Sequence, residues 1–354
     1  MSKKIAIIGS GFGGLALAIR LQASGLETVI LEKRDKPGGR AYFYEEKGFH
    51  FDAGPTVMTA PHIFEELFEL TDKKMEDYIE LIPIDPFYRL LWPDGEVFNY
   101  NSDMNALYAQ IEKLNPKDVR GYNKFLKFSN AVFKEGYEKM VDHPFQSIWS
   151  MVKVAPQLLL LQSFRSVHSM VSKYIKHPKL RQAFSYHTLL LGGSPYSSSA
   201  IYSLIHALEH KWGVWFAKGG TSALVAGLVK LYEDLGGTLH LNCAVQSIET
   251  NDNNEVVSIH NENGERLEIA AVASNADIYH TYNELLSDNK TAQKKTKVLK
   301  RKKFSPSLFL LHFGLRREHP QLAHHTILFG PRWKELLEDI YHKGVLPEDN
   351  ALYL

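Results

Sequence analysis

Residues 4–14, with the sequence KIAIIGSGFGG, decide the fold of this chain. The first half is a short apolar run typical of a buried strand in a parallel sheet. The glycine-rich second half predicts a tight turn, and the apolar residues 15–23 predict a helix that ends before Gly25. A second apolar run at 27–32 completes a strand–helix–strand unit, which indicates an α/β domain of the Rossmann type.

The spacing of Gly9, Gly11 and Gly14 is typical of a dinucleotide-binding turn. Gly9 permits the turn, Gly11 lets the backbone approach a pyrophosphate, and Gly14 allows the helix to pack closely on the strand. The helix N-terminus offers N–H groups and a positive dipole end to the phosphates. Glu32 ends the second strand, where a carboxylate can bind ribose hydroxyls. These features predict a dinucleotide site but do not separate NAD from FAD.

Two further turns favour FAD. Glu32 is followed by Gly38-Gly39-Arg40, a glycine pair next to a fixed positive charge that suits phosphates. The sequence GFHFDAGP then gives another small-residue turn at residues 48–55. The alternative interpretation is that both are purely structural turns, but their order after Glu32 argues for a cofactor role.

Longer segments resemble the bacterial-type phytoene desaturases, within the flavoproteins that include amine oxidases and carotenoid desaturases. The resemblance runs along the whole chain and rests on GGLALAIRLQASGL (13–26), RDKPGGRAY (34–42), FDAGPTVMT (51–59), DPFYRLLW (85–92), VFNYNSD (97–103), residues 200–209 and WGVWFAKGGTSALVAG (212–227). It implies an FAD-dependent enzyme that passes hydride from an allylic carbon of a C40 polyene, phytoene, to the flavin. It also implies association with a membrane surface.

The resemblance carries FAD contacts to specific residues of this chain. They are Gly9, Gly11, Gly14, Glu32, Gly39, Arg40, Gly54 and Val245, the last through its backbone next to the adenine. Asn275, at the return into the FAD-binding domain, is a further candidate. No catalytic residue is identified, because hydride transfer to a flavin needs no dedicated triad. Asp52 is a candidate base by position, and its alternative role is to cap a turn.

The expected architecture is a Rossmann-type FAD-binding domain with an inserted mixed α+β substrate domain and a helical membrane-associating region. Residues 1–80 would form the FAD-binding βαβ unit and 81–210 the substrate and membrane-associating region. Residues 211–280 would return into the FAD-binding domain, with a β-hairpin at Asn263-Gly264. Residues 281–354 would be the second part of the substrate domain.

One long stretch is basic. From Asp142 to Glu209 no acidic residue intervenes, while six basic residues occur: Lys153, Arg165, Lys173, Lys176, Lys179 and Arg181. Apolar residues recur at helical spacing from Leu160 to Ile175, which predicts an amphipathic helix with a basic face. Such a helix either faces the core or rests on anionic lipid, where each nearby basic residue contributes about 1 kcal/mol. The family resemblance favours lipid.

Composition excludes several other classes. The 41 basic and 40 acidic side chains nearly cancel, so a nucleic-acid partner is not expected, and the basic run 294–303 is interpreted as a solvated helix face or loop. Cys243 is the single cysteine, which excludes an internal disulfide framework. His187 and His206 are interpreted as buried histidines with satisfied hydrogen bonds, and no metal site is expected. With no apolar run of spanning length, we expect a cytoplasmic chain at the inner face of the cell membrane.

Alternative functions remain at this point. They are a related carotenoid isomerase or oxidase, a C30 diapophytoene desaturase, and a non-catalytic isoprenoid-binding chaperone of the GDP-dissociation-inhibitor kind. An NAD dehydrogenase is disfavoured by the second glycine pair. The resembled family continues past residue 354 with a glycine-rich segment and a helix that complete the site around the flavin. We therefore also expect that the chain is C-terminally truncated, with weakened FAD binding and with its activity in doubt when it is on its own.

Overall fold

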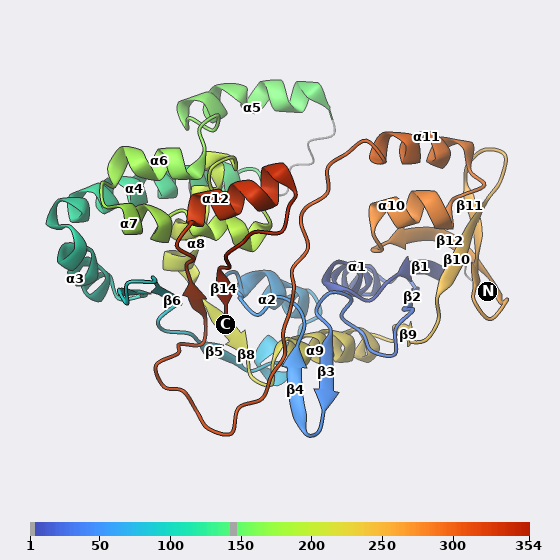
Figure 1. Ribbon diagram of the computed structural model, residues 1–354. Helices are drawn as coiled ribbons and strands as arrows, with labels where there is room; N and C mark the ends of the chain where they lie inside the picture. The colour runs from blue at the N-terminus through green and yellow to red at the C-terminus, as the bar shows by residue number, and fades with distance from the viewer. Residues whose placement is uncertain (1–3, 142–146) are drawn as a thin grey trace. The chain divides into compact units, whose positions relative to one another are not determined.

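The computed structural model describes residues 4–141 and 147–354, and it divides into two compact units (Figure 1). Unit 1 comprises residues 1–82, 215–304 and 310–314, and unit 2 comprises 83–214, 305–309 and 315–354. Residues 281–304 therefore belong to unit 1, whereas the sequence-based ranges grouped them with the substrate domain. The functional roles given to those ranges stay predictions.

Unit 1 is built on a six-stranded sheet in the order β10-β11-β12-β1-β2-β9. Its parallel part contains β1 (Lys4–Ile8), β2 (Thr28–Leu31), β9 (Thr238–His240) and β12 (Arg266–Ser274). The antiparallel part adds β10 (Val245–Thr250) and β11 (Val256–Asn261). The predicted hairpin at Asn263-Gly264 is confirmed, because it joins β11 to β12 and Gly264 has a φ of +78°.

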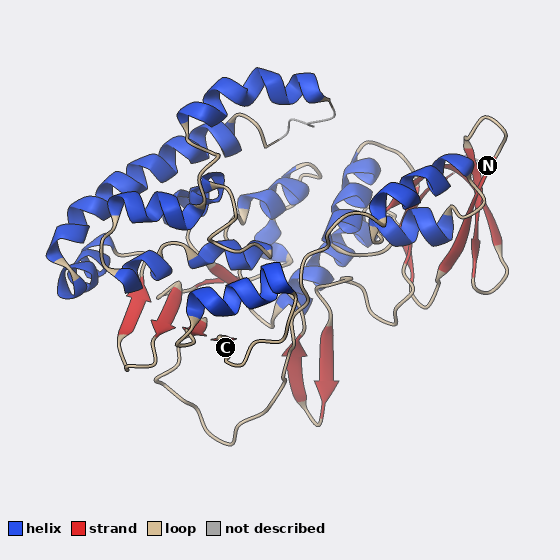
Figure 2. Ribbon diagram, turned by 45° about the horizontal axis from the view of Figure 1, so that its top comes forward, coloured by secondary structure: helices blue, strands red, loops and turns tan. Residues whose placement is uncertain are grey.

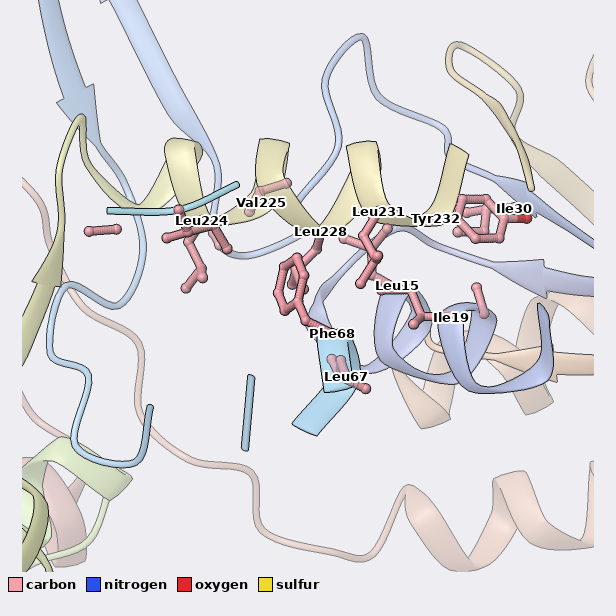
Figure 3. Packing of buried hydrophobic residues seen from close by; sticks show 14 of the residues in the cluster. Leu15, Ile19, Ile30, Leu67, Phe68, Leu224, Val225, Leu228, Leu231 and Tyr232 are labelled. Carbon is pink, nitrogen blue, oxygen red and sulfur yellow. The ribbon is translucent and has the colours of Figure 1, made fainter. Parts of the chain in front are cut away.

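Both faces of β2 and of the second half of β1 are buried, as the apolar runs predict. Alternate residues point to opposite faces: Ile7 and Ile30 enter one core, whereas Ile8 and Leu31 enter the other. The first core packs the sheet against three helices, α1 (Phe12–Ala23), α2 (His62–Glu69) and α9 (Thr221–Asp234). Figure 3 shows the side chains of α9 facing those of α1 and α2. This packing holds the N-terminus of α1 at the end of β1.

Smaller elements complete unit 1. The strands β3 (Phe43–Glu46) and β4 (Phe49–Asp52) form a hairpin, and β5 (Leu81–Pro83) pairs with β8 (Trp215–Ala217). The short helices are η1 (Met75–Asp77), α10 (Ile278–His280) and η5 (Thr281–Leu285). The basic run overlaps α11 (Lys290–Leu299), whose lysines are mostly exposed, as the interpretation of a solvated face requires.

Unit 2 is mostly helical (Figure 2) and contains one four-stranded sheet in the order β14-β13-β6-β7. Its strands are β6 (Tyr88–Leu91), β7 (Val97–Tyr100), β13 (Thr326–Leu328) and β14 (Leu352–Tyr353). Its helices are α3 (Met104–Leu114), α4 (Pro116–Phe133), η2 (Lys134–Glu138), α5 (Ile148–Leu160), α6 (Val167–Tyr174), α7 (Pro178–Ala183), η3 (Tyr186–Leu191), η4 (Ala200–Ser203), α8 (Leu204–Trp212), α12 (Trp333–Glu338) and η6 (Asp339–Lys343).

The predicted amphipathic helix from Leu160 to Ile175 is wrong. The chain turns after α5, with Gln162 at a φ of +51°, and Ser166 then caps α6 by accepting the N–H of Ser169. The apolar residues before the turn are exposed, and those in α6 are buried. The apolar spacing in the sequence therefore spans two separate elements, the exposed end of α5 and the core-facing helix α6. Asp142, where the acid-free stretch begins, lies outside the described residues.

Candidate functional site

The glycine turn joins β1 to α1, and its glycines are needed for backbone conformation at Gly9 and for close packing at Gly14. Gly9 has a φ of +93° and donates its N–H to the carbonyl of Leu31 at 2.8 Å. A Cβ on Gly14 would lie 2.1 Å from the carbonyl oxygen of Gly9. Gly11 is the N-cap of α1, which has no side-chain cap and no acid in its first turn. The first N–H groups of α1 are thus not satisfied by a side-chain cap, so this helix end suits an anion.

Glu32 lies beside the turn and is held in place by it. Its carboxylate is almost fully buried and accepts hydrogen bonds from the N–H and hydroxyl of Ser10 at 2.8 and 2.7 Å, both on Oε2. Oε1 accepts only the N–H of Arg34, at 3.0 Å, among the hydrogen bonds found in the described residues. A carboxylate oxygen can accept two bonds, so Oε1 retains capacity for a ribose hydroxyl. Ser10 was missed by the sequence reasoning because it occupies a variable position of the motif.

The second glycine pair packs directly on the first turn. Gly38 donates its N–H to the carbonyl of Ser10 at 3.1 Å, and a Cβ on Gly39 would lie 3.1 Å from the Cα of Gly11. Gly54 packs against Arg40, because a Cβ on Gly54 would lie 2.2 Å from the carbonyl oxygen of Arg40. The side chain of Arg40 is exposed. The structure therefore gathers all three predicted turns at one end of the parallel strands.

Two candidates from the second half of the chain also reach this end. Cys243 donates its N–H to the carbonyl of Glu32 at 2.9 Å, which brings the segment just before β10, two residues from Val245, to the end of β2. Asn275 donates its N–H to the carbonyl of Ile8, and its side chain lies over the glycine turn. A Cβ on Gly11 would lie 2.8 Å from its Nδ2. Asn275 therefore belongs to the structure of the turn.

Asp52 caps a helix that begins far away in the sequence. Its Oδ2 accepts the N–H of Thr221 at 3.0 Å, at the N-terminus of α9. The N-cap residue Gly220 has no side chain, so the carboxylate of Asp52 takes the capping role and complements the helix dipole. Capping is thus what the geometry shows for Asp52, although the partner is a helix and not its own turn.

Unit 1 also contains an apolar cavity of about 290 Å³. It starts beside Phe12, the residue after Gly11, and the segment from Pro55 to Ala60 forms one wall. The ring of Phe12 contacts that of Phe64 edge to face at 5.6 Å. None of the lining residues is ionisable: Phe12, Pro55, Thr56, Val57, Met58, Thr59, Ala60, Ile63, Phe64, Phe216, Ala217, Thr221 and Leu224.

Unit 2 contains a fully buried cluster of polar side chains. His187 of η3 lies against α8, with Nε2 3.2 Å from Oε2 of Glu209. Burial lowers the pKa of His187 to about 3 and raises that of Glu209 to about 7. His206 is satisfied as predicted, since its nitrogens lie 2.9 Å from the hydroxyl of Tyr100 and 2.9 Å from the carbonyl of Phe184. For His187 the prediction is wrong, because neither nitrogen has a hydrogen-bond partner among the described residues.

Comparison with known proteins identifies the family. The profile described as "Flavin containing amine oxidoreductase" matches residues 12–341. A lycopene-forming phytoene desaturase of Pantoea ananas is 55% identical over 352 residues, covering 99% of this chain and 71% of the relative. Another, from Pseudescherichia vulneris, is 53% identical over the same shares. This chain belongs to the phytoene desaturase family.

Solved structures place the phytoene desaturase chain in a wider fold. An oxidoreductase from Methanosarcina mazei superposes with a TM-score of 0.58 at 17% identity, over 84% of this chain and 64% of that one. A putrescine oxidase bound to putrescine gives a TM-score of 0.54 at 18% identity, over 79% and 59%. The fold is therefore that of the flavin amine oxidases, with a Rossmann-type FAD domain and a substrate domain, which confirms the predicted fold at this level.

The described residues fit the flavin that the family description names. The turn has no room for a Cβ at Gly14, α1 presents its uncapped N-terminus, and Glu32 keeps one acceptor site. Among the described residues, no helix has the length and apolarity needed to cross a membrane.

Proposed function

We propose that this chain is an FAD-dependent phytoene desaturase, an oxidoreductase that introduces conjugated double bonds into a C40 polyene in carotenoid biosynthesis. The observation that carries the proposal is its 55% identity, over 99% of its length, to a lycopene-forming phytoene desaturase. The buried glycine turn with Glu32 supports the cofactor.

We assign the FAD contacts as follows. The backbone of Gly9, Gly11 and Gly14 and the N-terminus of α1 would hold the pyrophosphate. Glu32 would accept a ribose hydroxyl, and Val245 would meet the adenine through its backbone. Gly39, Arg40 and Gly54 would complete the part of the site that contacts the phosphates and the flavin. When bound, FAD supplies the hydride acceptor. Asn275 would act by holding the turn, since its side chain already packs on Gly11.

The apolar cavity is the best candidate for the reacting end of the substrate. Its walls offer apolar surface and no ionisable group, and its volume is at the small end of ligand pockets. A C40 chain would therefore place only one end there. Phe12 and Phe64 line this cavity next to the glycine turn, so a charged residue at 64 tests its role.

A membrane surface is the partner that α5 supports. Trp149, Leu160 and Phe164 are 75%, 81% and 71% exposed, which is unusual for large apolar side chains on a helix and its end. Lys153 is also exposed and adds positive charge. An apolar surface of this kind, inside a stretch without acidic residues, suits the inner face of the cell membrane and its anionic lipids.

Binding to vesicles tests this assignment. The 354-residue chain should sediment with vesicles containing phosphatidylserine, with a blue shift of tryptophan fluorescence, and L160E/F164E should reduce the bound fraction at least tenfold. V298E changes another exposed apolar residue, on α11 and 57% exposed, and should bind as the unmodified chain does. Equal binding of all three proteins would remove α5 from the membrane contact.

Expression in a phytoene-producing host tests the activity. Coloured polyene should accumulate with the unmodified chain, and chromatography of the extract gives the number of new double bonds. Phe64→Glu should lower product while flavin content is retained. A colourless host that contains folded, flavin-loaded protein would overturn the proposed activity and leave the fold untouched.

A further inference from the structure

The buried polar group of unit 2 combines three side chains that can ligate a metal ion. His206 and Glu209 are three residues apart on α8 and so share one face of the helix. His187 reaches them from η3. Each offers one ligand atom, and these atoms lie within 4.8 Å of one another. All three side chains are at least 98% buried.

Several of these atoms have nothing to bind in the protein itself. Both ring nitrogens of His187 and Oε2 of Glu209 lack a hydrogen-bond partner among the described residues. Leaving a buried polar atom unpaired costs about 1–3 kcal/mol, and one bound ion would satisfy two of these three atoms, Nε2 of His187 and Oε2 of Glu209. The separation of 3.2 Å between Nε2 and Oε2 is close to the roughly 3.3 Å between donors around a tetrahedral zinc ion.

In two of the three ligands, His206 and Glu209, the remaining atom is held by an outer contact, as is common at metal centres. Nε2 of His206 lies 2.9 Å from the carbonyl of Phe184, and Oε1 of Glu209 accepts the hydroxyl of Tyr88 at 2.8 Å. Such outer contacts orient a ligating imidazole or carboxylate and leave its other atom for the ion. The hydroxyl of Tyr100 lies 2.9 Å from Nδ1 of His206 and would have to leave this nitrogen when an ion binds. It also lies 3.1 Å from Nε2 of His210, which the hydroxyl of Tyr122 approaches at 2.8 Å.

We propose that His187 Nε2, His206 Nδ1 and Glu209 Oε2 bind one divalent transition-metal ion. Two imidazoles and one carboxylate form a donor set used for zinc and for ferrous iron. The ion ties η3 to α8 inside unit 2 and neutralises the carboxylate that burial otherwise penalises. Because the ligands are closed to solvent, the ion enters while unit 2 folds.

A competing arrangement needs no ion. A protonated Glu209 could donate its hydrogen to His187 across the same 3.2 Å. The burial that keeps the imidazole neutral and raises the carboxyl pKa allows this equally well. The two arrangements differ in bound metal and in what zinc does to stability.

Refolding with and without zinc separates them. The 354-residue chain is unfolded in denaturant with a chelator, desalted, and refolded with or without ZnCl₂. We expect one zinc per chain by elemental mass spectrometry after dialysis, and a higher midpoint of thermal unfolding for the zinc-refolded protein. Refolding with CoCl₂ should give visible absorption bands from a site with nitrogen and oxygen ligands.

Variants locate the ion. Glu209→Gln keeps an acceptor for Tyr88 and should weaken zinc binding at least tenfold, as should His187→Gln. His342→Gln changes a half-exposed histidine of unit 2 and should leave binding unchanged. Unmodified protein that refolds with no bound zinc or cobalt and an unchanged midpoint would overturn the proposal, whether or not the variants fold. Equal zinc in the unmodified chain and in folded Glu209→Gln would do the same.

Discussion

Replacing Gly14 by alanine tests the steric account of the glycine turn. A Cβ at this position would lie 2.1 Å from the carbonyl oxygen of Gly9, whereas ordinary van der Waals contacts begin at 3.4 Å. The backbone of the turn or the start of α1 must therefore move by about 1 Å. The obstacle is backbone held by a strand, so rotation of a side chain cannot relieve it.

The magnitude follows from two opposing contributions. Alanine within a helix gains about 1 kcal/mol over glycine, while overpacking in a tight interior costs about 1–3 kcal/mol. The net loss in the free energy of unfolding is therefore expected to be about 0–2 kcal/mol. The larger effect falls on the cofactor, because a shift of 1 Å breaks one or two charge-assisted hydrogen bonds of about 1.5–3 kcal/mol each. FAD affinity should therefore fall at least tenfold.

Gly13→Ala is the matched control. Its Cβ would approach Oδ1 of Asn275 to 2.7 Å, so this variant presses on the side chain that packs on the turn, whereas Gly14→Ala presses on the backbone of the turn itself. Both variants gain the same helix propensity. Urea unfolding followed by circular dichroism gives stability, and titration of FAD by fluorescence gives affinity. If Gly14→Ala matched the unmodified chain in both assays, or if both variants lost FAD equally, the steric reasoning would be refuted.

Three other predictions concern capping, the core and pH. Asp52→Ala should cost about 1 kcal/mol in urea unfolding by uncapping α9, with Asp52→Asn losing less because an acceptor remains; equal losses would argue against capping. Leu228→Ala, at a fully buried position between α9 and the sheet, should cost about 2–5 kcal/mol, and a loss below 1 kcal/mol would contradict the packing in Figure 3. When a chelator removes metal, burial raises the pKa of Glu209 to about 7, so folding costs free energy once the carboxyl has to ionise. The stability of the unmodified chain relative to Glu209→Gln should therefore fall by about 3 kcal/mol as the pH rises from 4.5 through 7, and a flat difference would place Glu209 in water.

Local patterns predicted unit 1 well. The strand, turn and helix of residues 4–23, the strand at 28–31 and the hairpin at Gly264 all occur, because each depends on neighbours in the sequence. The longer sequence segments also indicated the family. The failed helix at 160–175 shows the limit, since apolar spacing is the same for a helix end in solvent and for a helix in the core.

The glycine turn, the Rossmann-type unit and the resemblance to phytoene desaturases can all be recognised from residue types and their spacing. Glycine is required in the turn by a positive φ and by contacts within a few residues, so the requirement is visible in the residue types. That Asp52 caps α9 and that His187 faces Glu209 can be seen only in the folded chain. The same holds for which apolar residues stay exposed on α5. These contacts join segments far apart in the chain, and no periodicity or spacing records which distant side chain a buried polar atom will meet.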